Sequence, residues 1–446
     1  MGRLFGTDGV RGIANIELTP ELAFNLGRAA AKVLSKFHKK PLFVIGKDTR
    51  ISGDMLEAAV IAGLCSCGAD VIKAGIVPTP AVAYLTRHFK ADSGVVVSAS
   101  HNPMEYNGIK FFDSRGYKLP DELEDEIEGI MNGAGFKENL PSGKEVGSVM
   151  EEDGISLYVN YVTSLFEANC FKGFKIALDC ANGAAFKAAP LVFEKLGAKV
   201  SVINNEPDGC NINVKCGSTH PEALSEFIKG KGLDIGFTFD GDADRLIAVD
   251  ENGEVVDGDH IMAIWGVYLK EKGKLLKDTV VATIMSNIGL EVALKKMGIK
   301  MVRTKVGDRY VMEEILKNGY NFGGEQSGHI IFLDHNTTGD GIITAVNLLA
   351  VLKEKKAKLS ELKNIMQVFP QVLINVKVRS KDGFETNTEI KKEIERAEKE
   401  LGENGRIVVR PSGTEPLIRV MVEGERKDTI EDIAKRVAEI IQKALS

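Results

Sequence analysis

The sequence has 446 residues, of which 44% are hydrophobic and 27% are charged, values typical of soluble globular chains. At about 150 residues per domain, this length predicts roughly three domains and excludes a single compact core. The 57 Lys and Arg residues nearly balance the 63 Asp and Glu residues, giving a net charge of −6. Both signs are scattered along the chain, which argues against nucleic acid or an anionic membrane surface as the main partner.

The cysteines and the N-terminus indicate the compartment. Six cysteines occur without a C-x-x-C pair, and in a chain of this length they are expected to be reduced, mostly buried thiols. The N-terminus lacks an apolar signal segment. The longest apolar-leaning run, 58–67, is much shorter than the ~18 residues that a membrane span needs. These features predict a soluble cytoplasmic protein.

Three stretches of the chain share one plan, which is a short apolar strand, a helix of about a dozen residues and a second apolar strand. They span 41–76, 174–203 and 279–304. Each helix is expected to end at a glycine, where left-handed backbone is tolerated. These glycines are Gly68, Gly197 and Gly298.

Further along each stretch, another apolar strand runs into a polar loop rich in Gly, Asp or Ser. The strands begin near 94, 235 and 320. Alternation of strands and helices is by itself common in α/β chains, but here the three loops are also the segments richest in chemically active side chains. Because ligands of open α/β sheets gather at the carboxyl ends of strands, the sequence predicts three copies of one α/β domain, one with an insertion.

The last part of the chain breaks this pattern. Strands are expected at 372–378, 405–409 and 417–423, with helices at 385–401 and 429–445, which indicates a mostly antiparallel α+β module. The predicted fold class is therefore α/β, with three similar three-layer α/β/α domains and a smaller C-terminal α+β domain. The predicted boundaries give domains 1–150, 151–253, 254–367 and 368–446.

The sharpest chemical signal is Asp-Gly-Asp-Ala-Asp-Arg at 240–245. Alternate carboxylates in a loop can converge on one hard cation, and Mg²⁺ is favoured because it commonly takes a few carboxylates plus a phosphate oxygen. A calcium EF-hand is disfavoured, because Arg245 stands where a Gly is needed and the flanks read as strands. A solvated acidic turn is the remaining alternative.

The segment 98–103, Ser-Ala-Ser-His-Asn-Pro, gathers hydroxyl and imidazole groups at the end of an apolar strand, and Lys110 follows nearby. The lack of a G-x-S-x-G motif disfavours a hydrolase-type serine. A serine beside His101 could instead carry a phosphoryl group whose charge the neighbouring cations stabilise. A helix cap or an ordinary turn is the alternative.

Two further loops are suited to a phosphorylated sugar. The segment 323–329, Gly-Gly-Glu-Gln-Ser-Gly-His, offers a carboxylate, an amide and a hydroxyl that can pair with sugar hydroxyls. The segment 410–419 combines two arginines with Ser, Gly and Thr, which can form a nest for a dianionic phosphate. No Walker A motif surrounds it, so a nucleotide is not implied.

Two arginines near the N-terminus have two possible roles, and the sequence does not choose between them. Arg11 lies in the segment 5–12 and Arg50 in the segment 46–50. Either residue is structural, or it enlarges the positive field around the serine of 98–103.

The four motifs together, in the same order and over essentially the whole chain, resemble the α-D-phosphohexomutase superfamily. They are Ser-Ala-Ser-His-Asn-Pro, Asp-Gly-Asp-Ala-Asp-Arg, Gly-Glu-Gln-Ser-Gly-His and Arg-Pro-Ser-Gly-Thr-Glu-Pro. The opening segment 2–12 and Gln326 are similar to the bacterial phosphoglucosamine mutase subgroup. The resemblance implies four domains around a central cleft.

The resemblance also implies roles for single residues. Ser100, which directly precedes His-Asn-Pro, would be the phosphoserine, and Ser98 only its neighbour. One Mg²⁺ per active site would be held by Ser100, Asp240, Asp242 and Asp244. The groups around the transferring phosphoryl would be His101, Lys110, Arg11 and Arg245, with acid/base work assigned to Lys110 or His101. Sugar hydroxyls and the non-reacting phosphate would be bound by Glu325, Ser327, His329, Arg410, Ser412, Gly413, Thr414 and Arg419.

The implied activity interconverts glucosamine 6-phosphate and glucosamine 1-phosphate through glucosamine 1,6-bisphosphate, which is an intermediate or activator. This activity would feed the synthesis of UDP-N-acetylglucosamine and cell-wall precursors. Two alternatives stay open, namely a mutase acting on glucose or mannose phosphates and a non-catalytic regulator that binds phosphosugars. The expected partner is a small phosphosugar, without nucleic acid or membrane, and the chain is expected to be a monomer or homodimer.

Overall fold

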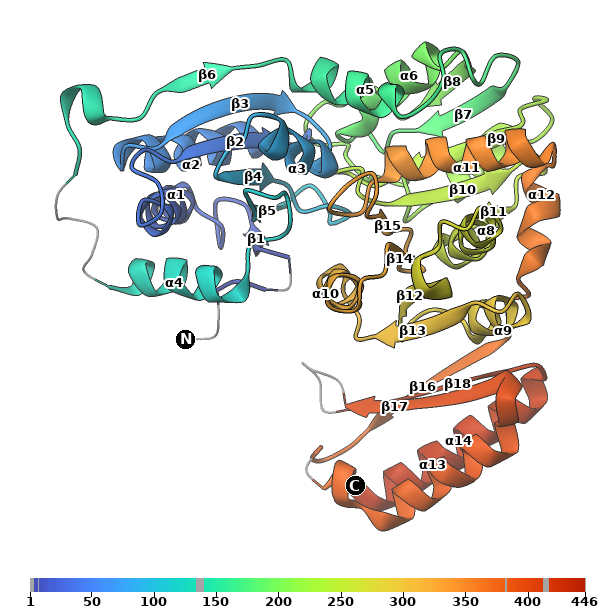
Figure 1. The fold of residues 1–446 in the computed structure, drawn as a ribbon. Coiled ribbons are helices and arrows are strands. Elements are labelled where there is room, and N and C mark those ends of the chain that lie inside the picture. Colours follow the sequence, from blue (N-terminus) through green and yellow to red (C-terminus); the bar gives the residue numbers. More distant parts are fainter. Residues whose placement is uncertain (1–3, 7, 134–139, 382, 412–416, 446) are drawn as a thin grey trace. The chain divides into compact units, whose positions relative to one another are not determined.

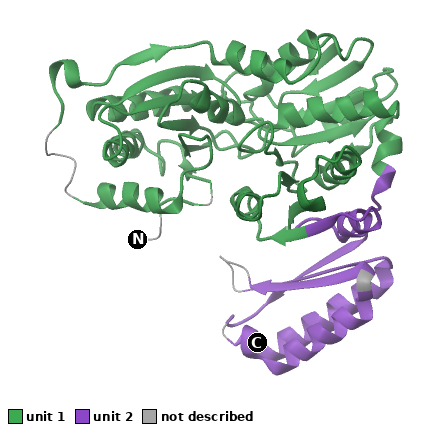
Figure 2. Cartoon of the chain, in the orientation of Figure 1, with its two compact units in different colours: residues 1–284, 302–363 green, residues 285–301, 364–446 purple. Residues whose placement is uncertain are grey.

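The computed structural model describes residues 4–6, 8–133, 140–381, 383–411 and 417–445. The chain divides into two compact units (Figure 2). Unit 1 comprises Met1–Ile284 and Val302–Lys363, and unit 2 comprises Met285–Met301 and Asn364–Ser446. The first two sheets and most of the third belong to unit 1, and the fourth sheet belongs to unit 2.

The first sheet has the strand order β1-β5-β4-β2-β3-β6. Strands β4, β2, β3 and β6 run parallel, whereas β5 is antiparallel to β4 and β1 is antiparallel to β5. The strands are β1 (Val10–Ile13), β2 (Leu42–Lys47), β3 (Asp70–Ile76), β4 (Ser93–Val97), β5 (Tyr106–Asp113) and β6 (Val149–Glu151). Its helices are α1 (Pro20–Leu34), α2 (Gly53–Ser66), α3 (Thr79–His88) and α4 (Asp121–Asn132). Every residue of β4 is buried, as expected for a central strand covered on both faces.

The second sheet has the order β11-β10-β9-β7-β8. Its strands are β7 (Lys175–Asp179), β8 (Lys199–Ile203), β9 (Ile235–Phe239), β10 (Leu246–Asp250) and β11 (Val255–Val256). Its helices are α5 (Gly154–Ser164), α6 (Ala185–Lys195) and α7 (Glu222–Ile228). Strands β8, β7 and β9 are parallel, and β10 is antiparallel to β9.

The third sheet has the order β13-β12-β14-β15. Its strands are β12 (Thr279–Thr283), β13 (Lys300–Thr304), β14 (Phe322–Gly324) and β15 (Ile330–Phe332). The helices of this part of the chain are α8 (Gly258–Glu271), α9 (Ile288–Lys296), α10 (Asp308–Asn318), α11 (Gly341–Lys355) and α12 (Leu359–Leu362). Strand β14 is parallel to β12 and antiparallel to β15.

The three sheets repeat one local topology (Figure 1). In each, a strand pairs in parallel with an earlier strand and is then followed by an antiparallel neighbour; these strands are β4, β9 and β14. The predicted glycines Gly68, Gly197 and Gly298 have φ of +88°, +91° and +68°, so each helix does end in left-handed backbone. The predicted threefold repeat of α/β domains is confirmed.

Unit 2 contains a sheet of order β16-β18-β17, whose three strands are antiparallel. Its strands are β16 (Gln371–Lys377), β17 (Gly405–Pro411) and β18 (Leu417–Gly424), and its two long helices are α13 (Thr388–Leu401) and α14 (Lys427–Leu445). The buried residues of α14 recur at helical spacing and pack against the sheet. This sheet with its two helices confirms the predicted smaller α+β part.

The predicted starts of both C-terminal helices are wrong, since α14 begins at Lys427 and not at 429. Helix α13 begins at Thr388 and not at 385, because the Asn387 side chain accepts hydrogen bonds from the backbone N–H groups of Glu389 and Ile390. The preceding Phe384–Thr386 forms a separate 3₁₀ turn.

The expectations from the cysteines and the apolar runs have different outcomes. None of the six cysteines is in a disulfide, but only Cys180 and Cys216 are buried and Cys210 is exposed, so the prediction of mostly buried thiols is wrong. Among the described residues, no helix combines the length and apolar character that a membrane span requires.

Candidate functional site

Three loops of unit 1 each connect two antiparallel strands, and one of them, the aspartate loop, contacts the other two. The serine loop (98–105) connects β4 to β5, the aspartate loop (240–245) connects β9 to β10, and the glutamate loop (325–329) connects β14 to β15. The Ser100 hydroxyl donates to Asp240 Oδ2 at 2.5 Å, and Leu246 N–H donates to the Gly328 carbonyl at 3.0 Å. The repeated topology therefore brings together three of the chemically loaded loops that the sequence singled out.

Ser100 has an unusual backbone for a residue with a Cβ. Its φ is +52°, in the left-handed region, and the side chain is buried. Its Oγ lies 2.5 Å from Asp240 Oδ2 and 3.4 Å from His101 Nδ1. The hydroxyl of Ser100 is therefore directed toward the aspartate loop.

The three carboxylates of the aspartate loop form a candidate metal centre. Asp240, Asp242 and Asp244 are buried, and each offers a ligand oxygen within 4.8 Å of the others. One oxygen each of Asp242 and Asp244 is buried without a hydrogen-bond partner. Burial, reinforced by the charges of Asp244 and Asp242, raises the pKa of Asp240 well above its usual value. Buried carboxylates with open oxygens fit a hard divalent cation.

The aspartate loop closely approaches the serine loop through Gly241. A Cβ at Gly241 would lie 2.5 Å from the Ser100 carbonyl oxygen, so a side chain there would push the loops apart. Thr79, at the start of α3, fixes the loop from the other side. Its Oγ1 donates to Asp242 Oδ2 at 2.7 Å, and its N–H donates to the Asp242 carbonyl at 2.9 Å. Sequence reasoning missed Thr79, because no local pattern marks it.

Lys110, on β5, lies among carboxylates. Its Nζ is 2.9 Å from Asp242 Oδ2 and 3.1 Å from Asp8 Oδ2, and its side chain is 4% exposed. Burial acts to lower the pKa of Lys110, but Asp242 and Asp8 outweigh it and raise the pKa well above its usual value. Burial likewise acts to raise the pKa of Asp242, and Lys110 outweighs it and lowers that pKa. Lys110 is therefore a fixed positive charge at the site.

Asp8 is a second residue that sequence reasoning missed, although it lies inside the segment 5–12 that was singled out for Arg11. It forms ion pairs with Arg11, Lys110 and Lys118. Burial acts to raise the pKa of Asp8, but these cations lower it well below its usual value. Asp8 therefore stays ionised and links Arg11 to Lys110.

Arg245 and His101 complete this part of the site. The backbone N–H of Arg245 donates to Asp240 Oδ1 at 3.2 Å, and its Nε lies 3.9 Å from Asp244 Oδ1. Burial, together with the charges of Arg245 and Arg11, lowers the pKa of His101 to about 4. The His101 imidazole is thus neutral near pH 7.

The glutamate loop contributes His329 and Glu325. His329 Nδ1 lies 3.4 Å from Asp244 Oδ2, and its Nε2 lies 3.4 Å from Asp308 Oδ2. Burial acts to lower the pKa of His329, but these two carboxylates raise it to about 9. Glu325 is buried and accepts from the Gly307 N–H at 3.1 Å, whereas Ser327 is exposed.

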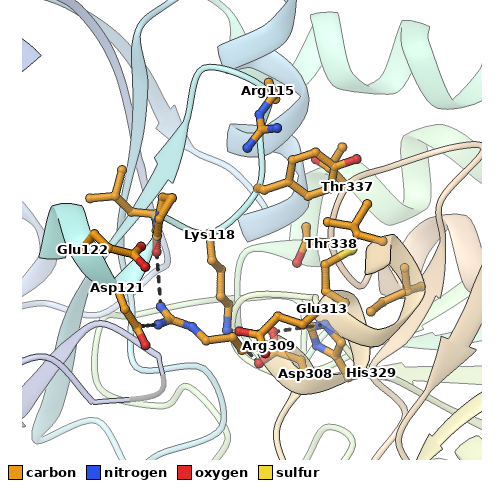
Figure 3. A pocket seen from close by; sticks show the side chains of 16 residues that line it. Arg115, Lys118, Asp121, Glu122, Asp308, Arg309, Glu313, His329, Thr337 and Thr338 are labelled. Carbon is orange, nitrogen blue, oxygen red and sulfur yellow. Dashed lines mark hydrogen bonds and ion pairs between the residues drawn. The ribbon is translucent and has the colours of Figure 1, made fainter. Parts of the chain in front are cut away.

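A pocket of about 280 Å³ lies beside His329 (Figure 3). It is lined by residues that follow β5 and by α10, including Lys118, Asp308 and Arg309. Lys118 Nζ lies 2.6 Å from Asp8 Oδ1 and 2.8 Å from Asp308 Oδ1, so the pair Lys118–Asp308 joins the first α/β domain to the third. Sequence reasoning did not select this pair, because the two residues are 190 positions apart.

Arg410 and Arg419 lie in unit 2. They are direct partners in the β17–β18 register, so the two side chains share one face of the sheet. Ser412, Gly413 and Thr414 lie outside the described residues.

Sequence models of four domain families match the chain in four consecutive segments. They are described as phosphoglucomutase/phosphomannomutase alpha/beta/alpha domain I (residues 2–138), domain II (156–253), domain III (257–369) and C-terminal domain (373–440).

Curated relatives match over the full length. A phosphoglucosamine mutase of Clostridium acetobutylicum is 59% identical over 446 residues, covering 99% of each chain. A phosphoglucosamine mutase of Thermoanaerobacter sp. is 59% identical over 451 residues, covering 100% of each chain.

Solved structures share the fold. A phosphoglucomutase/phosphomannomutase family protein of Burkholderia thailandensis superposes with a TM-score of 0.83 at 24% identity, covering 100% of this chain and 98% of that chain. The N-acetylphosphoglucosamine mutase of Aspergillus fumigatus, solved with GlcNAc-6P and magnesium, gives a TM-score of 0.71 at 18% identity, covering 99% and 96%.

Proposed function

Because the chain belongs to the phosphoglucomutase/phosphomannomutase family of α-D-phosphohexomutases, we propose that it is a phosphoglucosamine mutase, which interconverts glucosamine 6-phosphate and glucosamine 1-phosphate. The observation that carries this proposal is the Ser100 hydroxyl, which a left-handed backbone directs at a buried cluster of three aspartates. The choice of sugar is supported by the names of relatives that are 59% identical over the full chain.

In the proposed reaction, Ser100 carries the phosphoryl group. The P–Oγ bond breaks as the C1 hydroxyl of glucosamine 6-phosphate attacks, and this hydroxyl gives up its proton. The product is glucosamine 1,6-bisphosphate. Transfer of its 6-phosphoryl group back to Oγ then releases glucosamine 1-phosphate and restores phosphoserine. The same bisphosphate serves as the activator that phosphorylates a free Ser100.

Asp240, Asp242 and Asp244 are suited to hold Mg²⁺ together with an oxygen of phosphorylated Ser100. When bound, the cation would neutralise charge on the phosphoryl group during transfer. The open, buried oxygens of Asp242 and Asp244 support this assignment.

The positive side chains around Ser100 would stabilise the phosphoryl group without moving. Lys110 is held in place by Asp242 and Asp8, and the side chain of Arg245 lies beside Asp244. Arg11 is held by Asp8. Preorganised charge of this kind is the main source of rate in phosphoryl transfer, because the loose transition state needs little covalent help. Of the two residues that the resemblance implied for proton transfer, His101 is assigned this role, because its imidazole is neutral whereas Lys110 keeps its charge.

Substrate binding is assigned to two groups of residues. Glu325, Ser327 and His329 would contact the sugar hydroxyls, as the proximity of the glutamate loop to the aspartate loop supports. The phosphate that is not reacting would be bound by Arg410, Ser412, Gly413, Thr414 and Arg419. The cross-strand pairing of Arg410 with Arg419 supports this grip.

The wider setting follows from the same proposal. The partner of the enzyme is a small phosphosugar, and the protein acts in the cytoplasm as a monomer or homodimer. The nearly balanced charge of the chain supports the lack of a nucleic-acid partner. The four domains are proposed to end near 150, 253 and 367.

The proposal is tested by assaying the full chain on glucosamine, glucose and mannose 6-phosphates side by side. We expect the highest kcat/KM on glucosamine 6-phosphate, and we expect Ser100→Ala to lose turnover by about three orders of magnitude or more. Intact mass measurement should find one phosphoryl group on the wild type and none on Ser100→Ala. Preference for glucose or mannose phosphate would favour the related mutases, and binding without turnover would favour a regulator.

A further inference from the structure

A buried ion pair contacts the serine loop. Asp48 and Arg50 follow β2, and their side chains are both 0% exposed. Arg50 Nε donates to Asp48 Oδ2 at 2.9 Å. We propose that Asp48, Arg50 and Ser98 are positioning residues, which hold Ser100 in its left-handed conformation and so direct its Oγ toward Asp240. This inference rests on the proposed function.

The hydrogen bonds of Arg50 show that it acts on backbone and not on a ligand. Its guanidinium donates to four backbone carbonyl oxygens. Three belong to the serine loop, namely Ser100 at 2.9 Å, Asn102 at 2.8 Å and Pro103 at 2.5 Å. The fourth belongs to Tyr106, the first residue of β5, at 3.1 Å. With Asp48 on its Nε, every side of the planar group is engaged. Of the two interpretations that the sequence left open for Arg50, the structural one is therefore favoured over the positive field.

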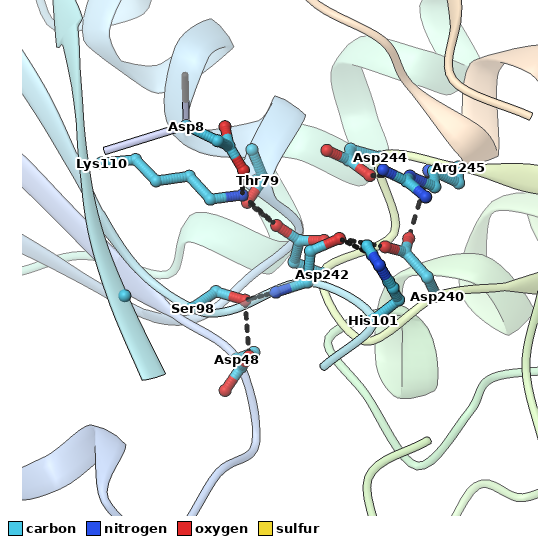
Figure 4. Close-up of polar contacts among 12 residues, drawn as sticks. Asp8, Asp48, Thr79, Ser98, His101, Lys110, Asp240, Asp242, Asp244 and Arg245 are labelled. Carbon is cyan, nitrogen blue, oxygen red and sulfur yellow. Dashed lines mark hydrogen bonds and ion pairs between the residues drawn. The ribbon is translucent and has the colours of Figure 1, made fainter. Parts of the chain in front are cut away.

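Ser98 connects the ion pair to Ser100. Its Oγ donates to Asp48 Oδ2 at 2.5 Å and accepts from the Ser100 N–H at 3.0 Å (Figure 4). The hydroxyl therefore uses its one proton on Asp48 and a lone pair on the backbone of Ser100. An alanine at position 98 would leave both the carboxylate and the buried N–H without this partner.

Both peptide groups that flank Ser100 are fixed by these contacts. Ser98 binds its N–H, whereas Arg50 and Asn213 Nδ2, each at 2.9 Å, donate to its carbonyl oxygen. A left-handed residue with a Cβ persists only where its surroundings over-determine it, and such residues cluster at functional sites. Asp48, Arg50 and Ser98, which we call the clamp, supply that restraint.

The segment 48–51, which contains Asp48 and Arg50, also contacts the second α/β domain. Thr49 Oγ1 donates to the Asn182 carbonyl at 2.6 Å, and Ile51 N–H donates to the Gly209 carbonyl at 2.9 Å. Arg50 lies between these two anchors in the sequence. The clamp therefore sets the position of Ser100 relative to the domain that carries Asp240, in addition to its local conformation.

The test compares Ser98→Ala with Ser93→Ala in the full chain. Ser93 is the first residue of β4, the strand that leads into the serine loop; it is as deeply buried as Ser98 and donates through Oγ to the Phe112 carbonyl at 2.7 Å. We expect kcat of Ser98→Ala to fall about 10-fold to 100-fold while KM changes less than about twofold, because the reacting atom is displaced. Ser93→Ala should keep kcat within about twofold, although its melting temperature falls by a similar amount.

A second readout does not depend on turnover. Amide hydrogen exchange at Ser100 should be faster in Ser98→Ala than in the wild type and unchanged in Ser93→Ala. If Ser98→Ala matches Ser93→Ala in both kcat and exchange, the inference is wrong. If the wild type turns over none of the three hexose phosphates, the proposed function fails, and the exchange measurement still decides whether the clamp holds Ser100.

A second pair of variants tests the arginine. Arg50→Lys keeps the positive charge near Asp48 but cannot reproduce the planar set of carbonyl bonds. We expect it to accept phosphoryl from glucosamine 1,6-bisphosphate at least about 10-fold more slowly, as followed by intact mass. Arg426→Lys, at an arginine that is 75% exposed and paired with Asp428, should behave as the wild type. An unchanged rate in folded Arg50→Lys would overturn the role of Arg50.

Discussion

At the scale of single residues, the site is an arrangement of charges that compensate one another. Lys110 is buried between Asp242 and Asp8, and this pairing keeps all three ionised. The pKa of Asp240, in contrast, is raised by burial and by the charges of Asp244 and Asp242, which outweigh the opposite effect of Arg245. The carboxylate cluster therefore carries negative charge that a divalent cation would compensate.

This imbalance predicts that Mg²⁺ stabilises the folded chain. Adding Mg²⁺ to chelator-treated protein should raise its melting temperature in a concentration-dependent way, because an ion that binds only the native state stabilises it by mass action. Asp244→Asn should lose most of that shift. The measurement is thermal unfolding across a Mg²⁺ titration.

The matched control is Asp54→Asn, at a carboxylate that is 88% exposed. Its Mg²⁺ shift should equal that of the wild type. A shift that survives in Asp244→Asn, or that is missing from the wild type, would remove the aspartate loop from metal binding.

At the scale of elements, helix caps fix the segments that support the loops. Asp340 caps α11 by accepting from the Ile343 N–H at 2.9 Å, and it also accepts from the Tyr158 hydroxyl at 2.7 Å and from Asn336 at 3.0 Å. Burial outweighs these hydrogen bonds and raises the pKa of Asp340 to about 6. The cap therefore carries a proton more readily than an ordinary aspartate.

This raised pKa predicts the sign of a pH effect on stability. Between about pH 4 and pH 6 the native state keeps the proton that the unfolded state releases, so this contribution to stability is present at low pH and is lost as the pH rises. Relative to the wild type, Asp340→Asn should gain up to roughly 3 kcal/mol across that window. Urea unfolding at several pH values measures the difference.

Asp153→Asn provides a control of opposite sign. Asp153 caps α5, and its hydrogen bonds from the side chain and backbone of Ser156 lower its pKa. Its contribution is therefore present at neutral pH and is lost as the pH falls. If the two variants showed the same pH trend, the assignment of Asp340 as the group with the raised pKa would be wrong.

At the scale of the whole molecule, the division into units does not follow the sequence in order. The segment Met285–Met301, with α9, belongs to unit 2. Glu423 on β18 accounts for this, because it is 1% exposed and accepts hydrogen bonds from Asn287 and from the Ile288 N–H. Arg406 pairs with Glu423 and donates to the Ser286 carbonyl at 2.7 Å.

Glu423→Ala is therefore predicted to release this segment. Removing one partner of a buried ion pair leaves the other charge uncompensated, which costs about 3 kcal/mol. We expect lower stability and faster proteolytic cleavage within 285–301, followed by mass spectrometry of the fragments. The control is Glu425→Ala, at an exposed residue that bonds Asn404. Equal cleavage of both variants would contradict the role of Glu423.

The sequence by itself determined the repeated α/β pattern and the residue types of the chemistry. Hydrophobic periodicity and glycine position are local properties, so the helix ends at Gly68, Gly197 and Gly298 could be read directly. Alternate aspartates likewise indicated a metal loop, whose three carboxylates do converge in the structure. The start of α13 was predicted three residues too early, because the residues just before the capping residue Asn387 are also compatible with a helix.

Only the tertiary structure decided which distant residues act together. Ser100 and Asp240 are 140 positions apart, and Lys118 and Asp308 are 190 apart, so neither contact leaves a local pattern. The role of Arg50 was equally hidden, because a guanidinium that binds backbone carbonyls and one that binds a phosphate look the same in sequence. Local patterns record what a segment can form, whereas contacts between domains depend on how the sheets pack.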